Sequence, residues 1–150
     1  MRNFPIFIIA AASFAAASLA AAPPREQSPA PRDILALAGA GNSDEELARA
    51  VAAAQAHPLG SLQNPIRVGG PEGVRAYLAR LRCGDGNAPA IGRKQGGGTG
   101  AFGSVTEQYG VDCRAAAPGR VTLLLDIYHD GHEEDRAPAG FRLEPRRPVS

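Results

Sequence analysis

The chain has 150 residues, of which 44% are hydrophobic and 21% charged, and 16 Lys and Arg balance 15 Asp and Glu. This length accommodates one domain at most. The balanced charge argues against nucleic acid or an anionic membrane as a partner, because both require a strongly basic surface.

The N-terminal segment has the pattern of a bacterial secretory signal peptide. Arg2 supplies a positive charge, residues 4–22 are uncharged, and small residues precede a proline-rich stretch. We expect a signal helix over residues 1–20, cleaved after Ala20, because Ser18 then occupies the −3 position. The alternative is a retained anchor, since the uncharged run approaches the roughly 20 residues that span a bilayer. The sequence predicts an exported protein, periplasmic or secreted, with no stable membrane span after cleavage.

Residues 21–42 follow as a Pro/Ala-rich spacer, in which residues 33–38 can form one short helical turn. Ser43 and Glu46 make a capping box, so a helix is predicted over residues 43–56. It ends before Pro58, because the residue preceding a proline disfavours the helical conformation. Its apolar stripe is thin, so we expect the segment 43–57 to dock loosely.

Residues 59–143 have the pattern of a folded α+β domain. A helix is predicted over about residues 72–82, with Pro71 at its first position and a core-facing stripe at helical spacing: Val74, Tyr77, Leu78 and Leu81. The stripe indicates that this helix packs on a sheet.

Alternating apolar residues predict the strands of that sheet. The clearest are residues 105–113 and 121–127, and a short strand is expected at residues 66–68. Residues 141–143 could add an edge strand. We therefore expect a small antiparallel sheet of three or four strands packed on the helix, followed by a frayed tail over residues 144–150.

The sequence GTGAFGSV at residues 98–105 matches the glycine-rich loop of protein kinases. A kinase would need a lysine on the following strand, and no lysine follows Lys94. A dinucleotide site would need a helix after the glycines, whereas a strand pattern follows. The glycines are therefore predicted to form a flexible hairpin loop, with Phe102 folded back to the core.

Cys83 and Cys113 are the two cysteines of the chain. In an oxidising compartment an even pair is most simply a disulfide. A reactive thiol pair, the alternative, would favour a C-x-x-C spacing. We predict a structural bridge that stabilises the fold by roughly 3–4 kcal/mol through chain entropy.

Residues 126–135, DIYHDGHEED, carry two of the three histidines. Asp130-Gly131 is typical of a type I′ hairpin turn, which would place His129 and His132 opposite each other with Glu134 on the same face. Two imidazoles and a carboxylate suit zinc or another divalent metal, and an open coordination position could support hydrolysis. The alternative is a solvated acidic turn, and neither H-E-x-x-H nor H-x-x-E-H is present.

The stretches GSLQNPIRVGGPEGVRAYLARLRC (residues 60–83) and DIYHDGHEEDRAPAGF (residues 126–141) resemble a group of small exported bacterial proteins of uncharacterised function. The resemblance spans most of residues 60–143. It implies one folded unit there and no catalytic residues.

The sequence thus predicts a small exported protein with a non-catalytic binding or structural role, whose partner is a protein or a small ligand rather than nucleic acid. It would act through a patch on the sheet or through the His/acidic turn. The alternative is a divalent-metal-binding protein, with hydrolase activity as a further possibility, that uses His129, His132 and Glu134. We assign no other cofactor and no catalytic residue.

Overall fold

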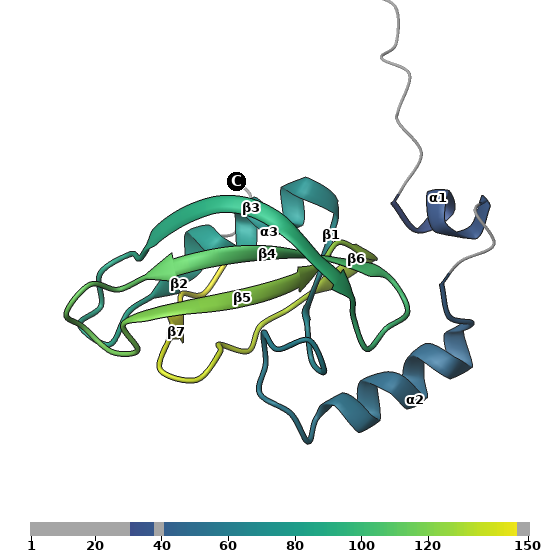
Figure 1. Ribbon diagram of the computed structural model, residues 1–150, viewed down its shortest axis with the longest axis horizontal. Coiled ribbons are helices and arrows are strands. Elements are labelled where there is room, and N and C mark those ends of the chain that lie inside the picture. The colour runs from purple at the N-terminus through teal and green to yellow at the C-terminus, as the bar shows by residue number, and fades with distance from the viewer. Residues whose placement is uncertain (1–30, 38–40, 147–150) are drawn as a thin grey trace, which may run out of the picture.

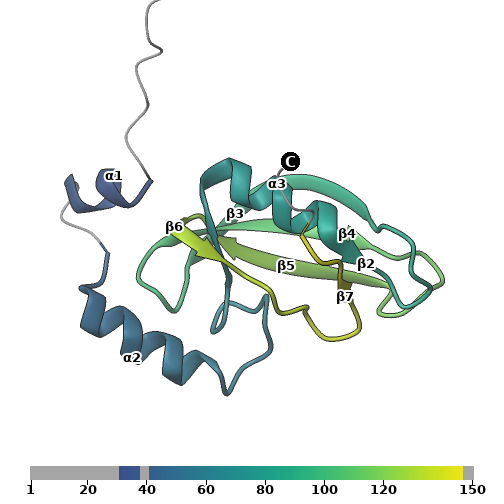
Figure 2. The same cartoon turned by 180° about the vertical axis from the view of Figure 1, so that it is seen from behind.

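The fold was analysed in a computed structural model of the protein, which describes residues 31–37 and 41–146. The predicted signal helix over residues 1–20 lies outside these residues. Figures 1 and 2 show a twisted sheet with one helix across a face and two further helices beside one end. None of the described helices is both long and apolar enough to span a bilayer.

Two helices precede the sheet. α1 (Pro31–Leu37) lies next to strand β6, and α2 (Asp44–Ala54) follows it. The capping box of α2 is formed as predicted, because the Ser43 backbone N–H donates to Glu46 and the Glu46 N–H donates to the Ser43 hydroxyl. We call residues 31–37 and 41–55 the N-terminal arm.

The main sheet has five strands in the order β3-β4-β5-β1-β6. β3 (Ala90–Thr99), β4 (Val105–Asp112) and β5 (Arg120–Asp126) form an antiparallel meander. β1 (Ile66–Gly69) runs parallel to β5 and antiparallel to β6 (Tyr128–Glu133). The expected α+β class and mostly antiparallel sheet are confirmed.

The expected strand number was too low, and one strand pair is parallel. Residues 90–99 pair along β4 as a full strand that was not among the expected strands. Residues 128–133 pair with β1 as the far edge strand. The predicted edge strand near residues 141–143 forms, as β7 (Arg142–Leu143), but it pairs outside the main sheet with β2 (Leu81–Arg82).

Helix α3 (Gly70–Arg80) covers one face of the sheet (Figure 2). It begins and ends two residues earlier than the predicted 72–82. Its end moves because Leu81 and Arg82 pair with β7 as a strand. The predicted apolar stripe is nevertheless buried, and Leu81 has no exposed surface. Because α3 and the sheet bury these side chains against each other, their seam is the hydrophobic core.

The predicted disulfide is formed between Cys83 and Cys113, with 5.7 Å between the two Cα atoms. Cys83 follows β2 and Cys113 follows β4, and both side chains are buried in the core. The bridge therefore joins the segment after α3 to the meander.

Candidate functional site

The site lies at the end of the sheet where β1 enters between β5 and β6. The parallel register pairs Arg67 of β1 with Asp126, the last residue of β5. A single residue, Ile127, then connects β5 to β6, which brings Tyr128 and His129 to the same end. An arginine, a histidine and a carboxylate are thus gathered by backbone pairing alone.

Asp126 has no solvent-exposed surface. Its carboxylate accepts hydrogen bonds from the Ser104 hydroxyl and from the Tyr128 backbone N–H at 3.1 Å. The Nε2 atom of His129 lies 3.3 Å from Asp126 Oδ2 but outside hydrogen-bonding geometry, and it has no hydrogen-bond partner in the described part of the chain. Since a buried carboxylate requires compensation, these three neighbours are its local stabilisation.

Phe102, in the turn between β3 and β4, contacts both His129 and Arg67. Its ring meets the His129 ring edge to face, with 5.3 Å between the centroids. The Arg67 guanidinium carbon lies 5.7 Å from the same centroid, a distance that permits a cation–π contact. Phe102 is 3% exposed, so the prediction that it folds back to the core is confirmed.

A cavity of about 290 Å³ separates this end of the sheet from the N-terminal arm. One wall comes from the sheet and its turns: Arg67, Phe102, Ser104, Tyr128, His129, Asp130 and His132. The other wall comes from the arm: Leu35, Gly41, Asn42, Asp44 and Leu47. The arm therefore encloses a space that the sheet alone would leave open.

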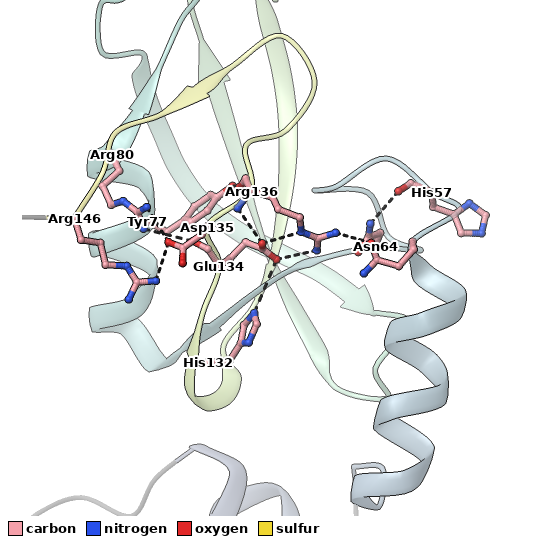
Figure 3. A network of polar contacts seen from close by, with 10 residues as sticks. His57, Asn64, Tyr77, Arg80, His132, Glu134, Asp135, Arg136 and Arg146 are labelled. Carbon is pink, nitrogen blue, oxygen red and sulfur yellow. Dashed lines mark hydrogen bonds and ion pairs between the residues drawn. The ribbon is translucent and has the colours of Figure 1, made fainter.

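A second polar network lies beside the cavity, around the buried Glu134 (Figure 3). The Arg136 guanidinium donates two hydrogen bonds to Glu134, from Nε to Oε1 at 2.9 Å and from Nη2 to Oε2 at 3.0 Å, and the Arg136 backbone N–H donates a third to Oε1 at 3.0 Å. Its remaining nitrogen, Nη1, donates to Gln55 at the end of α2, at 2.7 Å. This arginine thus connects the N-terminal arm to the sheet domain.

Burial acts to raise the pKa of Glu134, but the hydrogen bonds from Arg136 outweigh it and lower that pKa below its ordinary value. The Nε2 atom of His132 is 3.9 Å from Glu134 Oε2, beyond hydrogen-bonding distance. Burial, followed by the positive charge of Arg67, lowers the pKa of His132. Glu134 is therefore an ionised partner of Arg136, and His132 favours its neutral form.

The segment with the predicted metal ligands departs from the expected turn. A type I′ turn needs positive φ at both central residues, but among the described non-glycine residues only Arg114 has positive φ. Gly131 has φ 75°, whereas Asp130 does not share this conformation. Residues 129–132 instead form an irregularity in β6, between the residues that pair with Gly69 and Val68.

The structure brings His132 toward Glu134 and directs His129 toward Asp126. Both histidines line the cavity, whereas Glu134 is engaged by Arg136. No group of three or more His, Cys, Asp or Glu side chains within residues 31–37 and 41–146 is arranged to hold a metal ion.

Sequence reasoning missed Arg67, Ser104 and Asp126 as members of the site. Asp126 carried one usable signal, because an acidic residue at the end of an apolar strand needs a partner if it is buried. Nothing in the sequence pointed to Ser104 as that partner. Comparisons with protein-family models, with curated proteins and with solved structures find no match for the chain.

Proposed function

We propose that the protein is a small exported binding protein with a non-catalytic role, and that its ligand occupies the cavity between the N-terminal arm and the sheet. The supporting observation is the gathering of Arg67, His129 and His132 in the wall of one half-open cavity. Its volume of about 290 Å³ is at the small end of ligand sites in proteins. The disulfide is consistent with an oxidising compartment.

The hydrogen bonds of the site favour binding over nucleophilic catalysis. A serine nucleophile needs a base that takes its proton, as histidine does in the hydrolase triads. Ser104 donates to Asp126 rather than to His129. Its hydroxyl is also buried, at 3% exposure, so it serves the carboxylate and not a substrate.

The test is a fragment titration of the ¹⁵N-labelled, disulfide-bonded chain, followed by NMR. Small acids, amines and neutral amides are the probes. We expect at least one class to shift resonances in both cavity walls, at residues 42–47 and 128–132. A second groove, between α3 and strands β3 and β4, is the internal control. Shifts confined to that groove, or no shifts with any class, would contradict the proposal.

A divalent-metal-binding protein that uses His129, His132 and Glu134 is the second candidate. One observation favours it: in the described part of the chain, the Nε2 atoms of both histidines are buried without a hydrogen-bond partner. Neutral imidazole nitrogen is a common zinc ligand. Glu134 would have to exchange its bonds to Arg136 for the metal.

Metal content of protein purified without a His tag distinguishes the two candidates, together with thermal melts with and without chelator. A metal site predicts one zinc per chain, lost in His129→Ala and in His132→Ala. Binding should weaken at acidic pH, because metal ligation requires neutral imidazole. If chelator does not change the melting temperature and the purified protein contains no zinc, the metal-binding candidate is rejected.

A further inference from the structure

Arg67 has an unusual position for an arginine. It lies in the short strand β1, its side chain is half-buried, and its guanidinium lies over the Phe102 ring in the cavity wall. Burial is the largest influence on its pKa and lowers it. A desolvated cation is stable only when an anion compensates it.

The two buried carboxylates near Arg67 are already engaged. Asp126 accepts hydrogen bonds from Ser104 and from the Tyr128 backbone, and Glu134 forms a bidentate pair with Arg136. With the residues of the described ranges, Arg67 forms no ion pair and no side-chain hydrogen bond. Its guanidinium contacts Phe102, and the charges of Glu134 and Asp126 act on it without direct contact. Its donors remain available to the cavity.

A guanidinium presents a planar set of N–H donors that matches a carboxylate in a bidentate manner. The cavity wall adds further donors, the Asn42 amide and the Tyr128 hydroxyl. Asp44 and Asp130 also line the space. The negative charge of Asp44 disfavours a multiply charged anion such as phosphate, and it suits an ammonium group at the other end of a small ligand.

We propose that the cavity binds a small monocarboxylate, held through its carboxylate group by the Arg67 guanidinium. This inference rests on the proposed binding function and specifies its ligand class. The carboxylate belongs either to a simple organic acid or to an amino acid zwitterion, and a comparison of propionate with glycine distinguishes these two sources.

The probes are propionate, its neutral analogue propionamide, glycine and methylammonium, each titrated into the ¹⁵N-labelled chain. Propionate should shift the Arg67 side-chain Nε resonance and cavity residues, and propionamide should bind about tenfold more weakly or worse, because it lacks the charge-assisted bonds. Glycine binding more tightly than propionate identifies the zwitterion as the source. The reverse order identifies the simple acid, and either order supports a carboxylate site.

Two substitutions test the role of Arg67. Arg67→Gln should weaken propionate binding about tenfold or more, and Arg67→Lys should fall between, because lysine keeps the charge but not the planar fork. Arg75→Gln, on the exposed surface of α3, is the matched control and should bind like the wild type. If Arg67→Gln does not fold, the propionate affinity of Arg67→Lys and the shift of the wild-type Arg67 Nε resonance test whether Arg67 binds the carboxylate.

Equal binding of propionate and propionamide would overturn the inference, as would wild-type affinity in Arg67→Lys and Arg67→Gln. If propionamide or methylammonium binds in the cavity and neither propionate nor glycine does, the proposed ligand class is wrong but the proposed binding function stands. If no probe of any class binds, both the proposed ligand class and the proposed binding function are rejected.

Discussion

A carboxylate with no access to water depends entirely on the groups that surround it. Asp126 is such a group: it accepts hydrogen bonds from the Ser104 hydroxyl and the Tyr128 backbone N–H, and the His129 ring lies beside it. Ser104 belongs to the turn between β3 and β4, whereas Tyr128 and His129 begin β6. The carboxylate therefore fixes the relative position of the β3–β4 turn and the β5–β6 connection.

Removing the Ser104 hydroxyl should measure this contribution. Ser104→Ala leaves one site of the buried Asp126 carboxylate without a donor, so the free energy of unfolding should fall by about 1.5–3 kcal/mol. Urea denaturation of the disulfide-bonded protein is the measurement. In a double-mutant cycle with Asp126→Asn, the two effects should be strongly non-additive. Simple additivity would mean that the hydroxyl does not act through this carboxylate.

His132 should make stability depend on pH. Burial and the charge of Arg67 lower its pKa in the folded protein, below the unfolded value of about 6.5. The unfolded state therefore binds more protons, and the free energy of unfolding decreases as pH falls through about 6.5 toward the folded-state pKa. Urea denaturation between pH 7 and pH 5.5 should show a smaller decrease for His132→Asn than for the wild type. An equal decrease in the free energy of unfolding for the two proteins would contradict the lowered pKa of His132.

At the scale of single elements, β3 is the strand that its own sequence argues against. Its glycines lower the intrinsic tendency to form a strand, yet the segment pairs along β4. The close approach of the two strands explains one of these glycines. A Cβ atom at Gly97 would collide with Thr106 Oγ1 and lie 3.1 Å from Leu124 Cδ2, whereas a Cβ at Gly96 would meet nothing within 4 Å.

These two neighbouring glycines make a matched pair of substitutions. Gly97→Ala should lower the free energy of unfolding by about 1–3 kcal/mol, because the added methyl overpacks the site. Gly96→Ala should be neutral or slightly stabilising, because it restricts the unfolded chain without a clash. Chemical denaturation of both variants tests the difference. Equal stabilities would show that β3 does not pack closely on Thr106.

Elements with a local periodic signal were predictable. The stripe of α3 and the alternation in β5 each report the face that meets the core, and periodicity needs no knowledge of distant residues. The helix end was misplaced because Leu81 pairs with β7, a contact between distant segments. β3 was not expected for the same reason, since the partner strand and not the local propensity decides the conformation of its glycines.

The candidate site was predictable only in part. The histidine-rich segment drew attention to His129 and His132, and both line the cavity. The Arg67 and Ser104 contributions follow from the insertion of β1 between β5 and β6 and from the turn after β3. Neither arrangement can be recognised from the spacing of residues in the sequence. The proximity of Arg67 and Ser104 to the histidines could therefore not be predicted.

At the scale of the whole molecule, the disulfide and the Arg136 network connect different parts of the chain. The disulfide joins the segment after α3 to the meander, inside the core. Arg136 connects Glu134 of the sheet domain to Gln55 of the N-terminal arm. The first holds the folded unit together, and the second positions the arm over the cavity.

The double substitution Cys83→Ser and Cys113→Ser should lower the free energy of unfolding by roughly 3–4 kcal/mol, because an unbridged unfolded chain has more conformational freedom. Urea denaturation measures the loss. Adding a reductant to the wild type should reproduce it, and the double variant should not respond to reductant. A free-thiol titration of the denatured, unreduced wild type should find no thiol, and two thiols per chain would refute the bridge.

The position of β1 also bears on the order of folding. The β3–β4–β5 meander joins residues that are close in sequence, whereas Ile66 must find Leu125 across most of the domain. Contacts of large sequence separation carry a greater loop-closure cost and slow folding. Because Arg67 arrives with β1, the cavity wall is completed only when this distant pairing forms. Ligand-binding competence would then report complete folding, and a partly folded chain that already had its meander would not capture ligand.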